Sequence, residues 1–286
     1  MNTTAATRTD WDLVMRAKTG WFDLHLGDLW RYRDLVMIFV WRDFSAQYKQ
    51  TILGPLWHII QPLFTTLLFT LVFSGAAHLP TDGVTPLLFY MAGITCWNYF
   101  AQCLNGTSGT FVSNAAIFGK VYFPRLCVPV SIVLSNLIKF GIQFAIFLLV
   151  LAYFFLTGAA VHLTPLILLT PVLLLIMAAL GLGIGIVVSS LTTRYRDLQI
   201  FFVFAVQLFM YATPVIYPAS LIPAKYRLLI LANPMTAVVE TFRAAYLGTN
   251  TFAPWQLGYS ALATLVILAI GVLLFNHVER TFMDTV

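Results

Sequence analysis

The chain has 286 residues, of which 60% are hydrophobic and only 9% are charged, and its formal net charge is +5. Soluble domains carry about 25% charged residues, and a soluble protein of this size would need far more polar surface. The composition therefore excludes a soluble enzyme and a disordered chain, and it indicates an integral membrane protein. We expect no binding to nucleic acid, because the basic residues lie beside hydrophobic segments.

Residues 1–54 precede the membrane domain. Residues 1–30 contain four Asp residues and no apolar core of the kind that a secretory signal needs, so we predict no cleaved signal peptide. Residues 31–54 are too charged to span a bilayer and too apolar to be fully solvated. They are typical of an amphipathic helix in the membrane interface, with Trp41 or Phe44 pointing inward; an ordinary soluble helix is the alternative.

Six later segments have the length that a membrane-spanning helix needs, which is about 20 apolar residues. They are residues 55–77, 84–105, 127–157, 162–191, 198–217 and 255–277. We therefore predict an all-α permease domain over residues 55–277 with six transmembrane helices, followed by a tail at 278–286. Gly181, Gly183 and Gly185 in the fourth segment predict close contact with neighbouring helices.

Residues 218–248, between the fifth and sixth spans, are semi-apolar and interrupted by Pro218, Pro223 and Pro234. Irregular backbone at membrane depth is tolerated where protein or a water-filled cavity surrounds it. We predict two short re-entrant helices here, with a seventh span as the alternative.

The distribution of Lys and Arg predicts the orientation, because cytoplasmic loops carry the excess of positive charge. With the N-terminus inside, three basic residues lie outside, namely Lys225, Arg227 and Arg243, and Lys139 lies within the third span. The other twelve lie inside: Arg8, Arg16, Lys18, Arg31, Arg33, Arg42, Lys49, Lys120, Arg125, Arg194, Arg196 and Arg280. We therefore expect both termini to be cytoplasmic.

The chain lacks the patterns of the common catalytic sites. The nearest approach to a phosphate-binding loop, Gly119-Lys120, is followed by Val121 in place of Ser or Thr. No His-Glu-x-x-His pattern or Cys/His cluster indicates a metal. We expect no catalytic residue, no metal and no cofactor in this chain.

The connection between spans two and three, residues 109–126, is short, basic and partly apolar. Exposed apolar residues in such a loop indicate docking onto another protein. The alternative is that they pack beneath their own helical bundle. The candidate docking residues are Ile117, Phe118, Lys120, Tyr122, Phe123 and Arg125.

Four motifs occur in an order that resembles the polysaccharide-exporting permeases of type-2 ABC transporters, most of all the lipid-linked O-antigen permeases. Together they extend over most of the chain. They are the run from Gln47 to Trp57 with Gln61-Pro62, the Lys120 to Arg125 loop, Arg194-Tyr195-Arg196-Asp197, and Asn233-Pro234-Met235 with Glu240 to Arg243.

The resemblance implies a homodimer in the bacterial inner membrane with two cytoplasmic ATPase subunits, which bind ATP and Mg²⁺ in place of this chain. It implies an interface helix at 31–54, a coupling helix at 113–122 and re-entrant helices at 221–248 on the outer face. The expected activity is export of O-antigen linked to undecaprenyl diphosphate. Capsular polysaccharide, teichoic acid or a small hydrophobic drug are alternative cargoes, and a membrane enzyme acting on polyprenyl phosphates is a less favoured class.

Aromatic rings stack on the apolar faces of sugars without fixed direction, so aromatic residues in the spans are candidates for a glycan path. Packing against lipid or in interfacial belts is the alternative. Inserting a charged lysine at the depth of Lys139 costs free energy, so we expect its ammonium group to contact an anionic group or, by snorkelling, to reach the cytoplasmic face. The predicted path residues are Trp57, Tyr90, Trp97, Phe100, Lys139 and Tyr211, and the predicted diphosphate entrance is Arg31, Arg33 and Arg42.

Overall fold

The protein is described by a computed structural model that places residues 26–49, 51–121, 123–159, 161–193, 195, 197–249 and 253–285. Within these residues the regular structure is helical, without a strand. The α-helices are α1 (Leu26–Arg31), α2 (Arg33–Tyr48), α3 (Trp57–Phe69), α4 (Pro86–Ser108), α5 (Thr110–Phe118), α6 (Cys127–Leu156), α7 (Thr170–Thr192), α8 (Asp197–Tyr211), α9 (Ala224–Leu231), α10 (Pro234–Leu247) and α11 (Pro254–Thr285). Shorter turns are η1 (Gly54–Leu56), η2 (Thr70–Ala76, a π-helix), η3 (Pro165–Leu169) and η4 (Ala219–Leu221).

Local sequence sets the ends of α10. Pro234 occupies its first position, where a missing N–H costs nothing, and the Asn233 side chain caps the helix by accepting from the Met235 N–H at 2.9 Å. The helix is followed by Gly248 with φ of +73°, a left-handed conformation that glycine adopts without strain. These signals confine α10 to a short segment with fixed ends.

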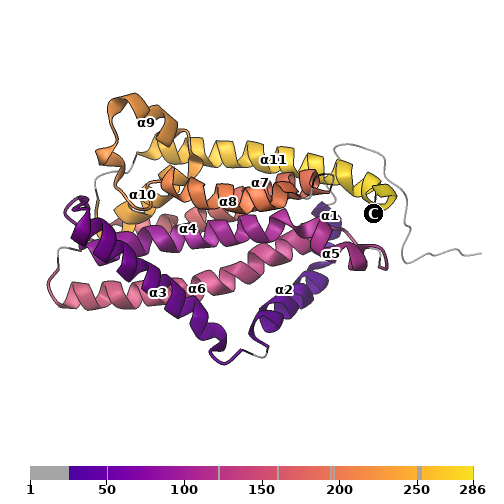
Figure 1. The fold of residues 1–286 in the computed structure, drawn as a ribbon, viewed down its shortest axis with the longest axis horizontal. Helices are drawn as coiled ribbons and strands as arrows, with labels where there is room; N and C mark the ends of the chain where they lie inside the picture. The colour runs from indigo at the N-terminus through magenta and orange to yellow at the C-terminus, as the bar shows by residue number, and fades with distance from the viewer. Residues whose placement is uncertain are drawn as a thin grey trace, which may run out of the picture.

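The long helices form an elongated bundle in which α7 packs against both α4 and α11 (Figure 1). Gly181 and Gly185 face α4, whereas Gly183 faces α11, where an added Cβ would lie 2.9 Å from the Leu268 Cα. The prediction that these glycines allow close helix contact is confirmed. α6 packs on the other side of α4, and α2 packs on α6.

Two hydrophobic cores lie in the bundle. The larger one is built on α4, α6, α7 and α10 and includes Trp97, Phe100 and Phe242. The smaller one joins α2, α5 and α11 through Phe39, Phe111 and Phe275. α5 lies at one end of the bundle and α9 with α10 at the other, so the two predicted functional regions are separated by the length of the helices (Figure 1).

Four helical segments among the described residues are long and apolar enough to cross a membrane: 57–76, 127–156, 165–192 and 254–278. If the bent pair α9 and α10 counts as one span, the number of candidate spans rises to five. α4 is long but carries Asn98, Gln102 and Asn105, and α8 has 15 residues, or about 22 Å of helix. The all-helical membrane fold is therefore confirmed, and the number six stays a prediction.

The region predicted to hold two re-entrant helices contains α9 and α10, which meet at 89°. This geometry fits a re-entrant hairpin or a sharply broken span. Two short helices with a break between them agree with the prediction, and a single straight seventh span is excluded by the bend.

The range predicted as an interface helix contains the end of α1 and all of α2, which ends at Tyr48, before Gly54. Val36, Phe39 and Val40 are buried, and α2 packs on α6. Ile38 and Trp41 are exposed, however, so apolar side chains lie on more than one face. One apolar face of α2 is therefore covered by the protein itself, and the amphipathic helix in the membrane interface stays a prediction.

Candidate functional site

The predicted coupling segment contains a helix, α5, but most of its large apolar side chains point into the protein. Phe118 and Phe123 are buried with their ring centroids 5.8 Å apart. Phe111 stacks on Phe275 of α11 at 4.4 Å. For Phe118 and Phe123 the structure therefore agrees with the alternative of packing beneath their own bundle, and they are not available for docking in this conformation.

A smaller set of residues remains exposed at this end of the bundle. We call Val112, Ala116, Lys120 and Val121 the α5 surface. Ile117 is half-buried, and the Arg125 guanidinium lies 5.6 Å from the centroid of the Phe118 ring. Tyr122 lies outside the described residues. The α5 surface keeps the mixed basic and apolar character that predicted a docking site.

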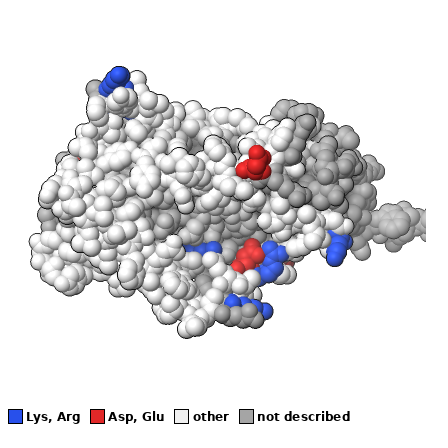
Figure 2. Space-filling view, in the orientation of Figure 1, with Lys and Arg blue, Asp and Glu red and all other residues white. Residues whose placement is uncertain are grey.

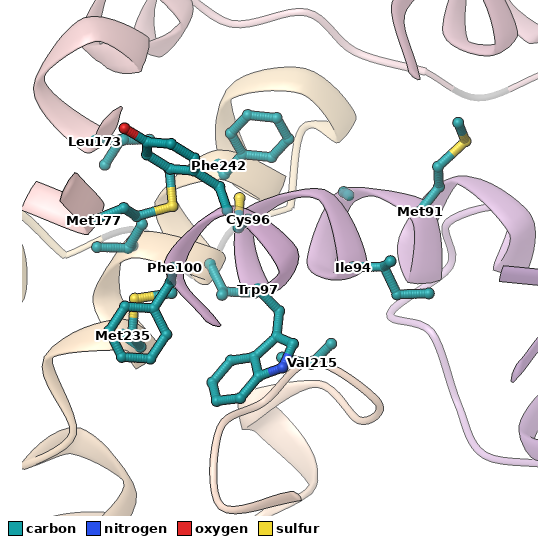
Figure 3. Close-up of a cluster of buried hydrophobic side chains, with 14 of the residues drawn as sticks. Met91, Ile94, Cys96, Trp97, Phe100, Leu173, Met177, Val215, Met235 and Phe242 are labelled. Atoms are coloured by element: carbon teal, nitrogen blue, oxygen red, sulfur yellow. The ribbon is translucent and has the colours of Figure 1, made fainter. Parts of the chain in front are cut away.

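The predicted path aromatics divide into two groups. Tyr90, Trp97 and Phe100 are buried inside the subunit, and Figure 3 shows the Trp97 indole pointing toward the segment that carries Val215. Trp57 and Tyr211 are 51% and 58% exposed. A glycan would contact the buried group only if these packed contacts opened, whereas the exposed pair lies on the surface of the subunit.

The three arginines of the predicted diphosphate entrance do not converge on a single pocket. Arg33 is exposed, and its Nε lies 3.9 Å from Asp34. Arg42 forms an ion pair with Asp43 at 2.7 Å and lies over the Phe39 ring. Arg31, which is exposed, ends α1. None of the three lines the cavity described next.

Lys139 lies beside a cavity of about 460 Å³ formed by α2, α3, α4 and α6. We call it the polar cavity. Figure 2 shows a face that is mainly uncharged, with a small group of basic and acidic atoms at a hollow. The lining residues are Asp43, Gln47, His58, Gln61, Gln102, Asn105, Gly106, Ile132, Ser135, Asn136 and Lys139.

Arg243, which the sequence analysis counted among the outer basic residues without giving it a role, forms a second site in α10. It is fully buried and donates to the backbone carbonyls of Pro214 at 2.6 Å and Val215 at 2.7 Å. Its third partner is the Glu240 carboxylate at 3.3 Å. The signal was present in the sequence, because Glu240 and Arg243 are three apart, and therefore on one helix face, in an otherwise apolar segment.

The polar cavity was also missed as a unit. Its signal is a repeated spacing of amide residues: Asn98, Gln102 and Asn105 recur every three or four residues along α4 and share one face. The corresponding positions on α6 are Asn136 and Lys139. Either pattern alone reads as scattered polar residues, and the fold brings the two together.

Comparison with known proteins gives a match over residues 34–247 to the family described as ABC-2 type transporter. The chain is 26% identical over 253 residues to the O-antigen export system permease protein RfbA of Klebsiella pneumoniae, covering 88% of this chain and 94% of that protein. It is 27% identical over 222 residues to the protein of the same name from Myxococcus xanthus, covering 77% and 82%. The polysialic acid transport protein KpsM of Escherichia coli is 24% identical over 247 residues, covering 85% and 93%.

Proposed function

The chain belongs to the ABC-2 type transporter family, and from this premise we propose that it is the permease subunit of an ATP-driven exporter of lipid-linked polysaccharide. The observation that carries the proposal is the near full-length similarity to two proteins named as O-antigen export permeases and one named as a polysialic acid transporter. The family match supports a transporter, and the names of the relatives support a polysaccharide cargo.

In this proposal the chain performs no hydrolysis itself. A separate ATPase subunit binds ATP and Mg²⁺ and docks on the α5 surface, at the cytoplasmic end of the bundle. Two copies of the permease face each other in the inner membrane. Closure of the ATPase moves α5, and α5 transmits the movement through Phe111, which stacks on α11.

We propose O-antigen on undecaprenyl diphosphate as the cargo, because the O-antigen permeases are similar to this chain over most of its length. Capsular polysaccharide is the second candidate, supported by the similarity to KpsM. The two candidates differ in where the polymer ends up, since O-antigen is joined to lipopolysaccharide and a capsule is not.

Deletion of the gene tests the function. We expect loss of polysaccharide from the cell surface and its accumulation inside the cell on the carrier lipid, with recovery when the gene is supplied on a plasmid. Mass spectrometry of the accumulated lipid then identifies the carrier, and immunoblots of lipopolysaccharide distinguish O-antigen from capsule. Normal surface polysaccharide of both kinds in the deletion strain would contradict the proposal.

The docking step is tested with charge changes on the α5 surface. Lys120→Glu combined with Val121→Asp should abolish copurification of the ATPase and export, while the amount of permease in the membrane stays constant, because both side chains are exposed. Tyr226→Asp, an exposed position on α9 at the opposite end of the bundle, is the matched control and should copurify normally. Intact assembly and export in the double variant would exclude this surface as the contact.

A further inference from the structure

The polar cavity has a composition that is unusual for a membrane domain. Nine of its eleven lining residues carry a polar or charged side chain, contributed by α2, α3, α4 and α6. Polar groups in a bilayer are costly unless they are paired, so polar residues of a membrane protein face the protein interior or a water-filled space. Convergence of four helices on one such space indicates a polar occupant.

The cavity lies in the half of the bundle that carries α5. Lys139 is twelve residues into α6, which corresponds to about 18 Å of helix from Cys127. On α4 the lining residues belong to the last turns, and on α3 they belong to the first turns. The cavity therefore lies inward from the end of the bundle that carries α5, and it does not reach the end that carries α9.

The cavity is lined by one lysine, Lys139, and one carboxylate, Asp43. Asp43 is engaged by Arg42 at 2.7 Å, which neutralises the lining carboxylate. Among the ion pairs formed by described residues, none includes Lys139. Lys139 therefore shares the cavity with Asp43, whose carboxylate is paired with Arg42, and forms no ion pair of its own among these residues.

A second, independent observation lies one turn away on the same helix. The Ser135 Oγ is buried, lines the cavity, and has no hydrogen-bond partner within the described part of the chain. Buried hydroxyl groups are ordinarily paired, and an unpaired one calls for a missing partner. Ser135 and Lys139, at positions i and i+4, present a hydroxyl donor and an ammonium donor on one face.

An apolar surface continues from the cavity. Gln61 lines the cavity from α3, and Leu68, seven residues later on the same face, is exposed together with the neighbouring Phe64. A ligand with a polar head and a hydrocarbon chain could therefore place its head in the cavity and its chain along α3. A free polysaccharide or a simple ion would leave that surface unused.

We propose that the polar cavity binds the phosphate-bearing head group of a lipid. This head group is the sugar-diphosphate end of the transported substrate. Lys139 and Ser135 donate to phosphate oxygens, and the side-chain amides of Gln61, Gln102 and Asn105 bind sugar hydroxyls. The inference rests on the proposed function and deepens it, because it assigns the substrate head to a pocket in one subunit. A phospholipid head group has the same phosphate chemistry, and the experiment below separates the two.

The test measures binding of radiolabelled undecaprenyl diphosphate to the full-length permease in nanodiscs of phosphatidylcholine. Lys139→Gln should weaken binding by about tenfold to a hundredfold, the loss expected for a hydrogen bond to a charged group. Ser135→Ala should weaken it by about threefold to tenfold. Lys139→Arg retains the charge and should retain most of the binding, and Lys225→Gln on exposed α9 is the control that should bind as wild type.

Unfolding temperatures are measured on the same samples. We expect Lys139→Gln to fold normally, because it removes a charge that is costly at this depth. Wild-type binding by folded Lys139→Gln and Ser135→Ala would overturn the proposal. So would equal competition by phosphatidylglycerol or by undecaprenol, since the first would make the cavity a general phospholipid site and the second would exclude recognition of phosphate. The gene deletion tests export separately, so binding without any export defect would refute the proposed function and not the cavity.

Discussion

Arg243 joins three segments that are distant in the sequence. Its guanidinium reaches the carbonyls of Pro214 and Val215 beyond the end of α8, and it lies over the Phe89 ring of α4 at 3.6 Å. Gly93 makes room for it, since an added Cβ there would lie 2.8 Å from Nη2 of the arginine. Backbone outside a regular helix leaves carbonyls without intrahelical partners, and here one side chain satisfies two of them.

Replacement of Arg243 should unfold the end of the subunit that carries α9 and α10. Arg243→Gln leaves the buried Glu240 carboxylate uncompensated, and breaking a buried pair in this way costs about 3–5 kcal/mol. Arg243→Lys should fail as well, because an ammonium lacks the planar fork that reaches several acceptors. The measurement is the amount of monodisperse permease and its unfolding temperature, with exposed Arg227→Gln as the control. Wild-type stability of Arg243→Lys would mean that charge alone is sufficient.

Trp97 and Trp57 allow a comparison between a buried and an exposed aromatic. Trp97 is 4% exposed, so Trp97→Ala should destabilise the subunit by about 3–5 kcal/mol and reduce export equally for all chain lengths. Trp57→Ala should leave stability unchanged and, if the ring guides sugar units, reduce export of long polymers more than short ones. The measurement for both variants is the amount of surface glycan, resolved by chain length and divided by the abundance of the permease. A length-dependent defect in stable Trp97→Ala would place the buried group on the path.

At the scale of elements, the position of α7 depends on glycines that face opposite neighbours. An added Cβ at Gly185 would overlap the Thr107 Oγ1 on α4, and one at Gly181 would lie 2.8 Å from the Cys103 Cβ. The backbones of α4 and α7 therefore approach more closely than a larger residue would permit, which gives van der Waals contact where the hydrophobic effect contributes little.

Alanine substitutions test this contact. Gly185→Ala should destabilise the permease by about 1–3 kcal/mol, since α4 and α7 must move apart. Gly141→Ala on α6 is the matched control, because nothing lies within 4 Å of its added Cβ. It should be neutral or stabilising by about 0.4–1 kcal/mol, since alanine lowers the conformational entropy of the unfolded chain. Thermal unfolding in detergent distinguishes them, and equal behaviour of the two variants would contradict the packing argument.

Much of the element order was predictable because long apolar runs, prolines and glycines act locally. The helices at 57–76, 127–156 and 254–278 and the break at Asn233 follow from such signals. The burial of Phe118 was not predictable, because it depends on rings from α2 and α11 that are distant in sequence. The same holds for Arg243, whose acceptors arise only where α8 ends, and for the polar cavity, which needs four helices to exist.

At the scale of the whole molecule, cysteine labelling tests the orientation that the positive charges predict. The α3–α4 connection and the region after α8 lie at one end, where the Ser220 hydroxyl donates to Asp82 at 2.8 Å, and α5, which Lys120 closely follows in the chain, lies at the other. In a background without Cys96, Cys103 and Cys127, we expect Asp82→Cys to react with an impermeant maleimide in intact cells. Lys120→Cys should react only after the membrane is opened. The reverse pattern would invert the assignment made from the positive charges.

The buried arginine also has a consequence for the order of biosynthesis. Its acceptors at Phe89, Pro214, Val215 and Glu240 all precede Arg243 along the chain. Because a nascent chain emerges from its N-terminus, each acceptor has been synthesised before the guanidinium leaves the ribosome. Arg243 therefore enters the membrane only after all of these acceptors have been synthesised. A circular permutant that begins within α9 would reverse this sequence, so its α10 would enter the membrane before α4 and α8 exist.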